Sequence, residues 1–161
     1  MRNGPQITTK NMELFLDGAD LINYPASGGS TWYDSSGNNR HVTFYNAGGT
    51  TYSSVAAGAP TRTVAKQGEF TFDGLNDWGK MASSISAGSS ITVSAWLKLT
   101  DTADRGFLSH CSGGPVNLGY GINAGKMYYK YYSGAWLSAT GTSTVNDGNW
   151  WNLVWAKSGT S

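Results

Sequence analysis

A tyrosine-rich segment carries the side chains best suited to binding chemistry. Residues 126–132 read KMYYKYY, and Trp136 follows four residues later. The alternation is typical of a β-strand and places Tyr129 and Tyr131 on one face. A planar aromatic surface can stack on a sugar ring, and it can equally hold a protein partner. The candidate binding residues are Tyr129, Tyr131 and Trp136.

The same tyrosines have a structural alternative. One pair can fill the core while the other pair packs beside a neighbouring strand. Lys126 and Lys130 share a face with Tyr128 and Tyr132, and lysines are almost never fully buried. The face with the lysines is therefore predicted to be the exposed one.

Oxygen-bearing side chains near glycine turns form a candidate calcium site. Ca²⁺ prefers carboxylate and carbonyl oxygens. The candidate ligands are Asp34, Asp73, Asn76 and Asp77. The alternative is that these side chains accept hydrogen bonds from backbone N–H groups and fix the turns.

Groups suited to catalysis are scarce. The glutamates are Glu13 and Glu69, whereas retaining glycoside hydrolysis needs two carboxylates about 5–5.5 Å apart. No Ser/His/Asp arrangement is suggested by spacing. His41 follows a polar turn, and His110 adjoins Cys111 in an apolar segment, which favours packing over a metal-binding or catalytic role. We expect no enzyme activity.

Composition narrows the class of protein further. The 161 residues suit one domain. Only 13% are charged and the net charge is +1, which argues against a clustered basic surface for nucleic acid. The single Cys111 excludes a disulfide scaffold. No apolar run reaches the roughly 18 residues of a membrane span, and no signal-peptide core follows residues 1–5. We expect folding in a reducing cytoplasm.

Short segments with period-two alternation run along most of the chain. In the clearest one, residues 91–99, the residues Ile91, Val93 and Ala95 share a face. Other strands are predicted at residues 12–17, 42–45, 70–72, 106–111, 116–122, 126–132, 135–140 and 149–156. A long loop with at most one edge strand is expected between residues 46 and 66. Many short strands with turn signals and no helical stripe predict an antiparallel sandwich or barrel.

Four segments carry family motifs in a fixed order. They are TWYDSSGNN within residues 14–39, FTFDGLNDW at residues 70–78, ITVSAWLK at residues 91–98 and DGNWWNLV at residues 147–154. Together they resemble laminin-G-like domains of the concanavalin A-like lectin and glucanase superfamily. The likeness covers residues 12 to 157. It implies an all-β fold, an antiparallel β-sandwich of the jelly-roll type.

The resemblance also implies how the chain is organised. An N-terminal arm (residues 1–11) precedes a jelly-roll domain over residues 12–161. Large rings at Trp96 and Trp150 are expected to fill the space between the sheets. Family members usually continue through a hairpin and more strands, so either the sequence is a fragment of a longer chain, or the last strands of the jelly roll are missing or are supplied by a partner. Relatives often hold Ca²⁺ near the loop ends of the sandwich.

The opening motif and its short arm are similar to laminin-G-like proteins that tailed phages often encode. This resemblance implies a virion structural protein, folded in the host cytoplasm, that serves as a capsid decoration, head fibre or tail adhesin. Its partners would be other virion proteins, symmetric copies of itself and surface glycans. The alternative is a carbohydrate-binding module of an extracellular or cell-surface protein. No nucleic acid, membrane or cofactor other than calcium is expected.

Overall fold

The computed structural model describes residues 10–45, 60–63, 68–85, 90–111, 116–132 and 135–158. The side chains of residues 110, 111 and 116–118 are outside this description, and so are the expectations for His110 and Cys111. Most of the predicted N-terminal arm and of the loop at 46–66 also lies outside the described residues. The chain forms two compact units, residues 1–85 and 86–161, which are described separately below.

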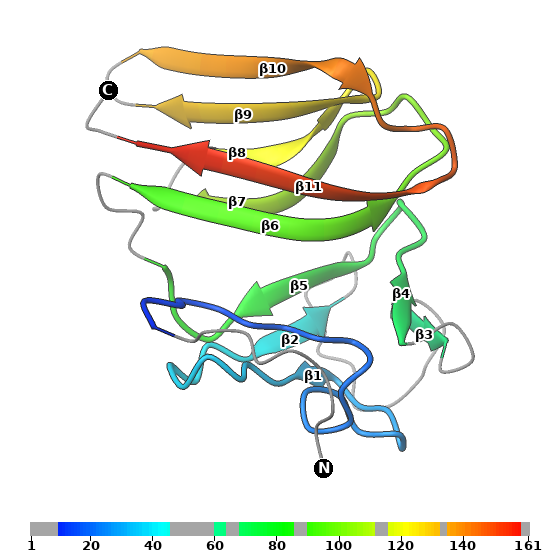
Figure 1. Ribbon diagram of the computed structural model, residues 1–161. Coiled ribbons are helices and arrows are strands. Elements are labelled where there is room, and N and C mark those ends of the chain that lie inside the picture. Colours follow the sequence, from blue (N-terminus) through cyan, green and yellow to red (C-terminus); the bar gives the residue numbers. More distant parts are fainter. Residues whose placement is uncertain are drawn as a thin grey trace. The chain divides into compact units, whose positions relative to one another are not determined.

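The first unit is built from short antiparallel strands. A three-stranded sheet has the order β1-β2-β5, and β3 pairs with β4 (Figure 1). The strands are β1 (Thr31–Trp32), β2 (Val42–Tyr45), β3 (Thr61–Thr63), β4 (Glu69–Thr71) and β5 (Trp78–Met81).

An aromatic cluster holds the first unit together. Phe44 is buried on β2, where alternate residues point inward. The ring of Phe70 lies 4.9 Å from that of Tyr24, 4.5 Å from that of Trp32 and 5.4 Å from that of Phe44, measured between centroids. Such tilted and edge-to-face pairs stabilise a core beyond the burial of their area.

The second unit contains two antiparallel sheets. One has four strands in the order β10-β9-β8-β7, and the other pairs β11 with β6 (Figure 1). The strands are β6 (Ile91–Lys98), β7 (Arg105–Cys111), β8 (Val116–Asn123), β9 (Lys126–Tyr132), β10 (Trp136–Thr144) and β11 (Trp150–Lys157).

The two sheets of the second unit enclose its core. Tyr120 and Ile122 on β8 are buried with Leu153 and Trp155 on β11. Trp155 crosses the gap, because its ring stacks on Phe107 at 5.7 Å and its Nε1–H donates to the Tyr128 carbonyl oxygen at 3.2 Å. A core shared between two packed sheets is the arrangement of a β-sandwich.

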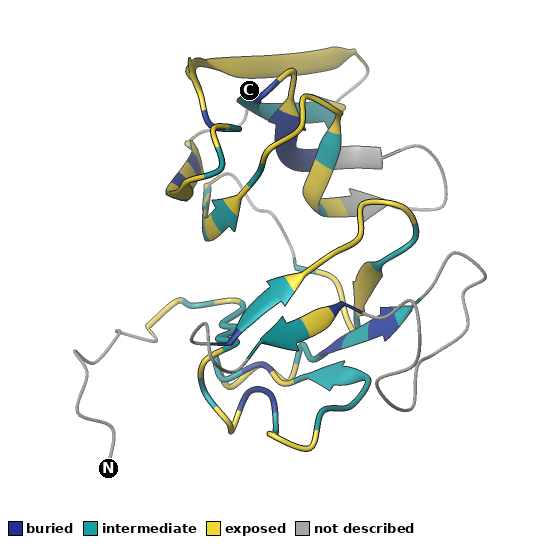
Figure 2. Cartoon of the chain, turned by 90° about the vertical axis from the view of Figure 1, so that its right-hand side faces the viewer, coloured by how far each residue is buried: buried dark blue, intermediate teal, exposed yellow. Residues whose placement is uncertain are grey.

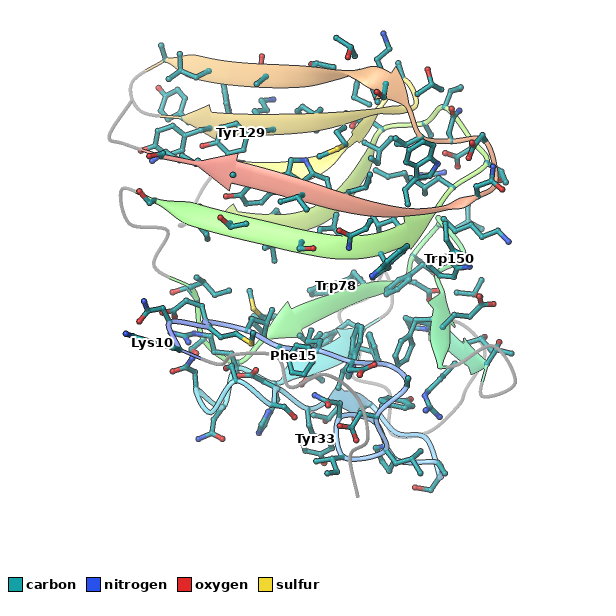
Figure 3. All side chains as sticks on the ribbon, viewed as in Figure 1. Lys10, Phe15, Tyr33, Trp78, Tyr129 and Trp150 are labelled. Carbon is teal, nitrogen blue, oxygen red and sulfur yellow. The ribbon has the colours of Figure 1, made fainter. Side chains whose placement is uncertain are left out.

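The tryptophans that fill this core are not the predicted ones. Trp96 is 66% exposed and Trp150 is 47% exposed, so the expectation that they lie between the sheets is wrong. Strand alternation is the reason: Trp151 and Trp155 share the inward face of β11 with Leu153, while Trp150 falls on the opposite face. Figure 3 labels Trp150 near the beginning of β11.

The prediction of an all-β antiparallel fold is confirmed. Among the described residues every element is a strand and every pairing is antiparallel, in an arrangement consistent with a β-sandwich. The strands predicted from residue 91 onward all form, and residues 12–17 form none. The described residues include no helix with the length and hydropathy to span a membrane. The jelly-roll topology and the single domain over residues 12–161 stay predictions.

Candidate functional site

The outer face of the four-stranded sheet presents a small aromatic group. Trp136 on β10 pairs directly with Tyr132 on β9, and the two ring centroids are 5.0 Å apart at 57°. Trp136 is 44% exposed and Tyr132 is 42% exposed. The Lys130 Nζ lies 4.1 Å from the Trp136 ring centroid, within the range of a cation–π interaction. We call Lys130, Tyr132 and Trp136 the outer aromatic surface.

Glycines on β8 let neighbouring groups pack closely against the outer face of the sheet. Gly119 pairs with Lys130 and Gly121 pairs with Tyr128, so these glycines share the outer face. A Cβ added at Gly121 would meet Tyr128 Cε1 at 3.3 Å and would collide with the Arg105 carbonyl oxygen. The Tyr128 ring therefore lies down against Gly121 and is half-buried. Burial raises the pKa of Tyr128, and the negative charge of Asp104 raises it further.

Tyr129 and Tyr131 face the other way. Both pack against the core of the second unit, and Tyr129 lies 5.4 Å from Tyr120 between ring centroids. The Lys157 Nζ lies 5.3 Å from the Tyr131 ring centroid. Hence the structure separates Trp136 from the other two candidate residues. It agrees with the alternative that one tyrosine pair helps to fill the core.

Asp34 is a structural residue of the first unit. Its Oδ1 accepts hydrogen bonds from the N–H groups of Phe15 (2.9 Å) and Ser36 (2.8 Å). Its Oδ2 accepts from the Arg40 N–H at 3.0 Å and the Ser36 hydroxyl at 2.8 Å. Burial acts to raise the pKa of this carboxyl, but the four hydrogen bonds outweigh it and lower the pKa. Both oxygens are thus already engaged by the protein.

The other three calcium candidates lie within one turn. Asp73 Oδ1 accepts from the N–H groups of Leu75 and Asn76, and Asp77 Oδ2 accepts from the Asp73 N–H at 2.9 Å. Two further oxygens, Asn76 Oδ1 and Asp77 Oδ1, are buried with no hydrogen-bond partner among the described residues. Burial raises the pKa of Asp77, and the charge of Asp73 raises it further.

These oxygens fit the chemistry of a hard cation. A bound Ca²⁺ would be held by Asp73, Asn76 and Asp77, and it would offset the charge repulsion between the two carboxylates. The described residues contain no group of three or more His, Cys, Asp or Glu side chains placed to hold a metal. Any site in this turn would therefore need amide, carbonyl or water oxygens as well as its two carboxylates.

A calcium titration tests this turn. We expect Ca²⁺ to raise the melting temperature by on the order of 5 °C at concentrations far above its Kd. Asp77→Asn should abolish the rise without lowering stability in EGTA, because it removes a carboxyl whose pKa is raised. Asp17→Asn in the same unit is the control and should respond to Ca²⁺ as the parent does. An equal rise for Asp77→Asn and for the parent would count against the site.

The remaining titratable candidates have local structural contacts. Glu13 forms an ion pair with Arg40 at 3.0 Å. The His41 Nδ1 accepts a hydrogen bond from the Asp34 N–H at 3.0 Å, and its ring lies 5.1 Å from that of Tyr33 between centroids. These contacts account for both side chains as parts of the packing around the Asp34 turn.

Two residues that contribute to these arrangements were not predicted as site residues from the sequence. Lys130 contacts Trp136 only because the β9–β10 register brings them to one face. Asn23 is completely buried, and its Nδ2 donates to the carbonyl oxygens of Phe15 and Tyr33. The signal for Lys130 was present in its alternation with Tyr132, whereas nothing local marks Asn23 as buried.

Comparisons with known proteins identify no relative of this chain. No protein-family model, no curated protein and no solved structure matches the chain. The class that the fold defines is that of all-β proteins with antiparallel sheets.

Proposed function

We propose that this chain is a non-catalytic carbohydrate-binding module displayed on a phage particle as a capsid decoration, head fibre or tail adhesin. The observation that carries the binding role is the outer aromatic surface, where Trp136 and Tyr132 remain over 40% exposed on a regular sheet. The phage setting rests on the sequence motifs and their likeness to laminin-G-like phage proteins.

The surface has the parts that sugar recognition needs. The apolar face of a sugar ring can stack on Trp136, while Tyr132 stands beside it at an angle. The Lys130 Nζ lies over the Trp136 ring, 4.1 Å from its centroid. A stacked sugar would take the place of this ammonium group, which could then donate hydrogen bonds to the hydroxyl or carboxylate oxygens of the sugar.

Display on a particle would strengthen such binding. A small exposed surface gives weak single-site affinity, because few contacts must offset the loss of translational freedom. Many symmetric copies would raise the effective concentration of sites and so the overall avidity. We therefore expect the isolated chain to bind glycans weakly. Whole particles should be retained much more strongly on glycan-coated surfaces.

A glycan array followed by calorimetry tests the carbohydrate role. We expect Trp136→Ala to weaken binding of the best array ligand by about fivefold or more, since stacking on an aromatic ring contributes on the order of 1 kcal/mol or more. The matched control is Trp96→Ala, which removes another exposed tryptophan of the same unit. Equal loss with both variants, or no ligand on the array, would contradict the role.

The particle setting has its own test. Purified virions should contain the chain at a copy number that matches a symmetric position, as seen by mass spectrometry and cryo-electron microscopy. Absence of the chain from the particles would overturn the phage setting and leave the alternative of a bacterial surface module.

A further inference from the structure

Lys130 lies where a sugar would stack on Trp136. Its Nζ is 4.1 Å from the centroid of the indole ring, a distance at which an ammonium group is attracted to the face of the ring. The ion pairs of the described residues involve arginines instead, for example Arg40 with Glu13. The chain itself therefore supplies a cation that occupies the ring, and a sugar that stacks on Trp136 must displace it.

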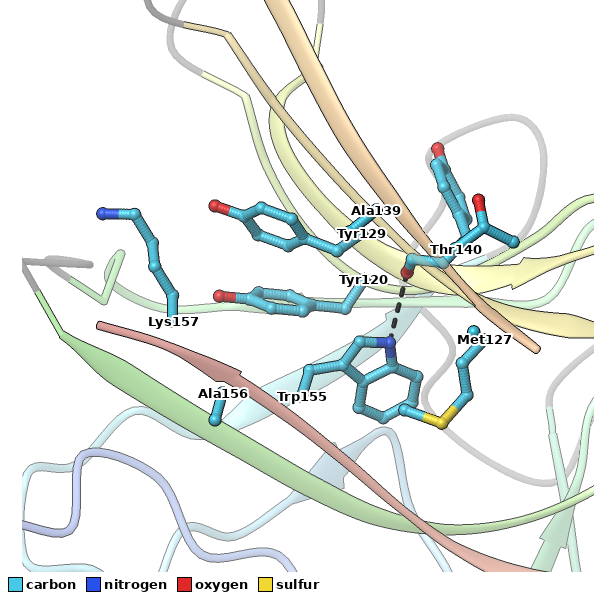
Figure 4. Close-up of a pocket in the computed structure, with 10 residues that line it drawn as sticks. Tyr120, Met127, Tyr129, Ala139, Thr140, Trp155, Ala156 and Lys157 are labelled. Atoms are coloured by element: carbon cyan, nitrogen blue, oxygen red, sulfur yellow. Dashed lines mark hydrogen bonds between the residues drawn. The ribbon is translucent and has the colours of Figure 1, made fainter. Parts of the chain in front are cut away.

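The lysine side chain is the part of this pair that can move aside. β9 lies between β8 and β10, and its register places Lys130 opposite Gly119 and Ser138. On the inner face of the sheet, the Trp155 Nε1–H donates to the Tyr128 carbonyl oxygen at 3.2 Å, the dashed line in Figure 4. These contacts hold the backbone of β9, whereas a lysine has a flexible four-carbon stem with three donors at its tip. The ammonium group can thus leave the ring without a change in the strands.

Displacing the ammonium group has different consequences for neutral and for acidic sugars. The lost cation–π contact of an exposed lysine weakens a competing ligand by about two- to fivefold. A neutral sugar regains only hydrogen bonds to its hydroxyl oxygens. A carboxylate on the sugar accepts a charge-assisted hydrogen bond, which is shorter and roughly twice as strong. An acidic sugar therefore recovers the cost of displacement, and a neutral sugar does not.

The charge that acts on a sugar at Trp136 is local. The whole chain has a net charge of only +1, so its overall field attracts anions weakly. Lys126 lies on the same face of β9 as Lys130, but four positions along the strand place it about 13 Å away. That separation exceeds the Debye length of roughly 8 Å at physiological salt. β10, which carries Trp136, is exposed at every position (Figure 2), so a glycan chain can approach this surface.

We propose that Lys130 makes the outer aromatic surface selective for glycans whose pyranose rings carry a carboxylate, the chemistry of hexuronic acids. This selectivity rests on the proposed function, because it requires a sugar on Trp136. In the unbound chain the ammonium group covers the indole ring and disfavours neutral sugars. In the complex it turns to the sugar carboxylate, while the apolar face of the same sugar stacks on the ring.

Matched pairs of oligosaccharides test this selectivity. Each pair joins an oligomer of glucuronate, galacturonate or mannuronate to its counterpart with the carboxylates reduced to hydroxymethyl groups, and calorimetry at low salt measures both affinities. We expect the parent to bind at least one acidic oligomer about threefold or more tightly than its neutral counterpart. Lys130→Gln should tighten binding of that neutral counterpart about two- to fivefold and reduce the acidic preference to below about 1.5-fold.

Lys126→Gln is the matched control, because it removes the same charge from the same face of the same strand. It should leave the acidic preference within about 1.5-fold of the parent value. A proton NMR spectrum reports the displacement directly. In the unbound chain the indole ring current should shift the ε-methylene protons of Lys130 upfield of those of Lys126, and the acidic oligomer should remove this difference.

Three results would overturn the role of Lys130. They are equal or tighter binding of every neutral counterpart by the parent, an unchanged neutral affinity in Lys130→Gln, and an equal loss of preference in Lys126→Gln. If one of them occurs while Trp136→Ala still weakens glycan binding, the proposed function stands and the selectivity alone falls. If no acidic or neutral glycan depends on Trp136, both fall together.

Discussion

Replacing Trp155 by alanine should destabilise the second unit by about 3–5 kcal/mol, the range for truncating a large core side chain. Trp155 is 5% exposed. The substitution would remove its stacking on Phe107 and its edge contact with Tyr120, and would leave the Tyr128 carbonyl oxygen without the indole N–H. Urea unfolding followed by tyrosine and tryptophan fluorescence measures the change.

The matched control for this result is Trp96→Ala. Both substitutions remove the same side chain from the same pair of strands, but Trp96 is 66% exposed on the opposite face. We expect a change of less than about 1 kcal/mol for the control. Similar losses for the two variants would mean that the faces of β6 and β11 are assigned wrongly.

Replacing Asp34 by alanine should cost roughly 3 kcal/mol in the first unit. Four donors lose their acceptor at once, and each buried donor left unpaired costs about 1–3 kcal/mol before local relaxation and water entry reduce the total. Asp34 is 8% exposed, so water has little access to replace the carboxylate. Asp17→Ala removes one such contact, to the Ala19 N–H, and should cost less than about 1 kcal/mol.

The same carboxylate predicts a pH dependence. Its pKa is lower in the folded state than in the unfolded chain, so its stabilisation is fully present above the unfolded value of about 3.9 and is lost as the pH falls through the folded value. Unfolding midpoints measured between pH 7 and pH 2.5 should fall more steeply for the parent than for Asp34→Ala. Parallel curves would show that Asp34 does not contribute to acid sensitivity.

The strands were largely predictable because their information is local. The alternation of Ile91, Val93, Ala95 and Leu97 appears directly as the inward face of β6. The segment at residues 12–17 alternates in the same way but forms no strand. Its backbone instead forms hydrogen bonds with side chains of the Asp34 turn: the Phe15 N–H donates to Asp34 Oδ1, and Asn38 Nδ2 donates to the Met12 carbonyl oxygen. These partners are 19 and 26 positions away in the sequence.

The choice between equivalent side chains was not predictable. β11 has tryptophans on both faces, so its alternation cannot say which of Trp150 and Trp155 is inside. Asp34 and Asp73 both occur near glycine turns, but only Asp34 receives a donor from residue 15. The contact between Lys130 and Trp136 depends on the register of a hairpin whose connecting residues, 133 and 134, lie outside the described chain.

We expect ligands to bind the outer face of the four-stranded sheet through Trp136, while the inner tyrosines pack against the core of the second unit. The seven tryptophan indole N–H groups give seven reporters in a ¹H–¹⁵N spectrum, and Trp136→Phe assigns the decisive one. On titration with the best glycan ligand, we predict a shift of the Trp136 signal and no change at Trp151 and Trp155. A shift at Trp155, Trp96 or Trp150 with Trp136 unchanged would contradict the account.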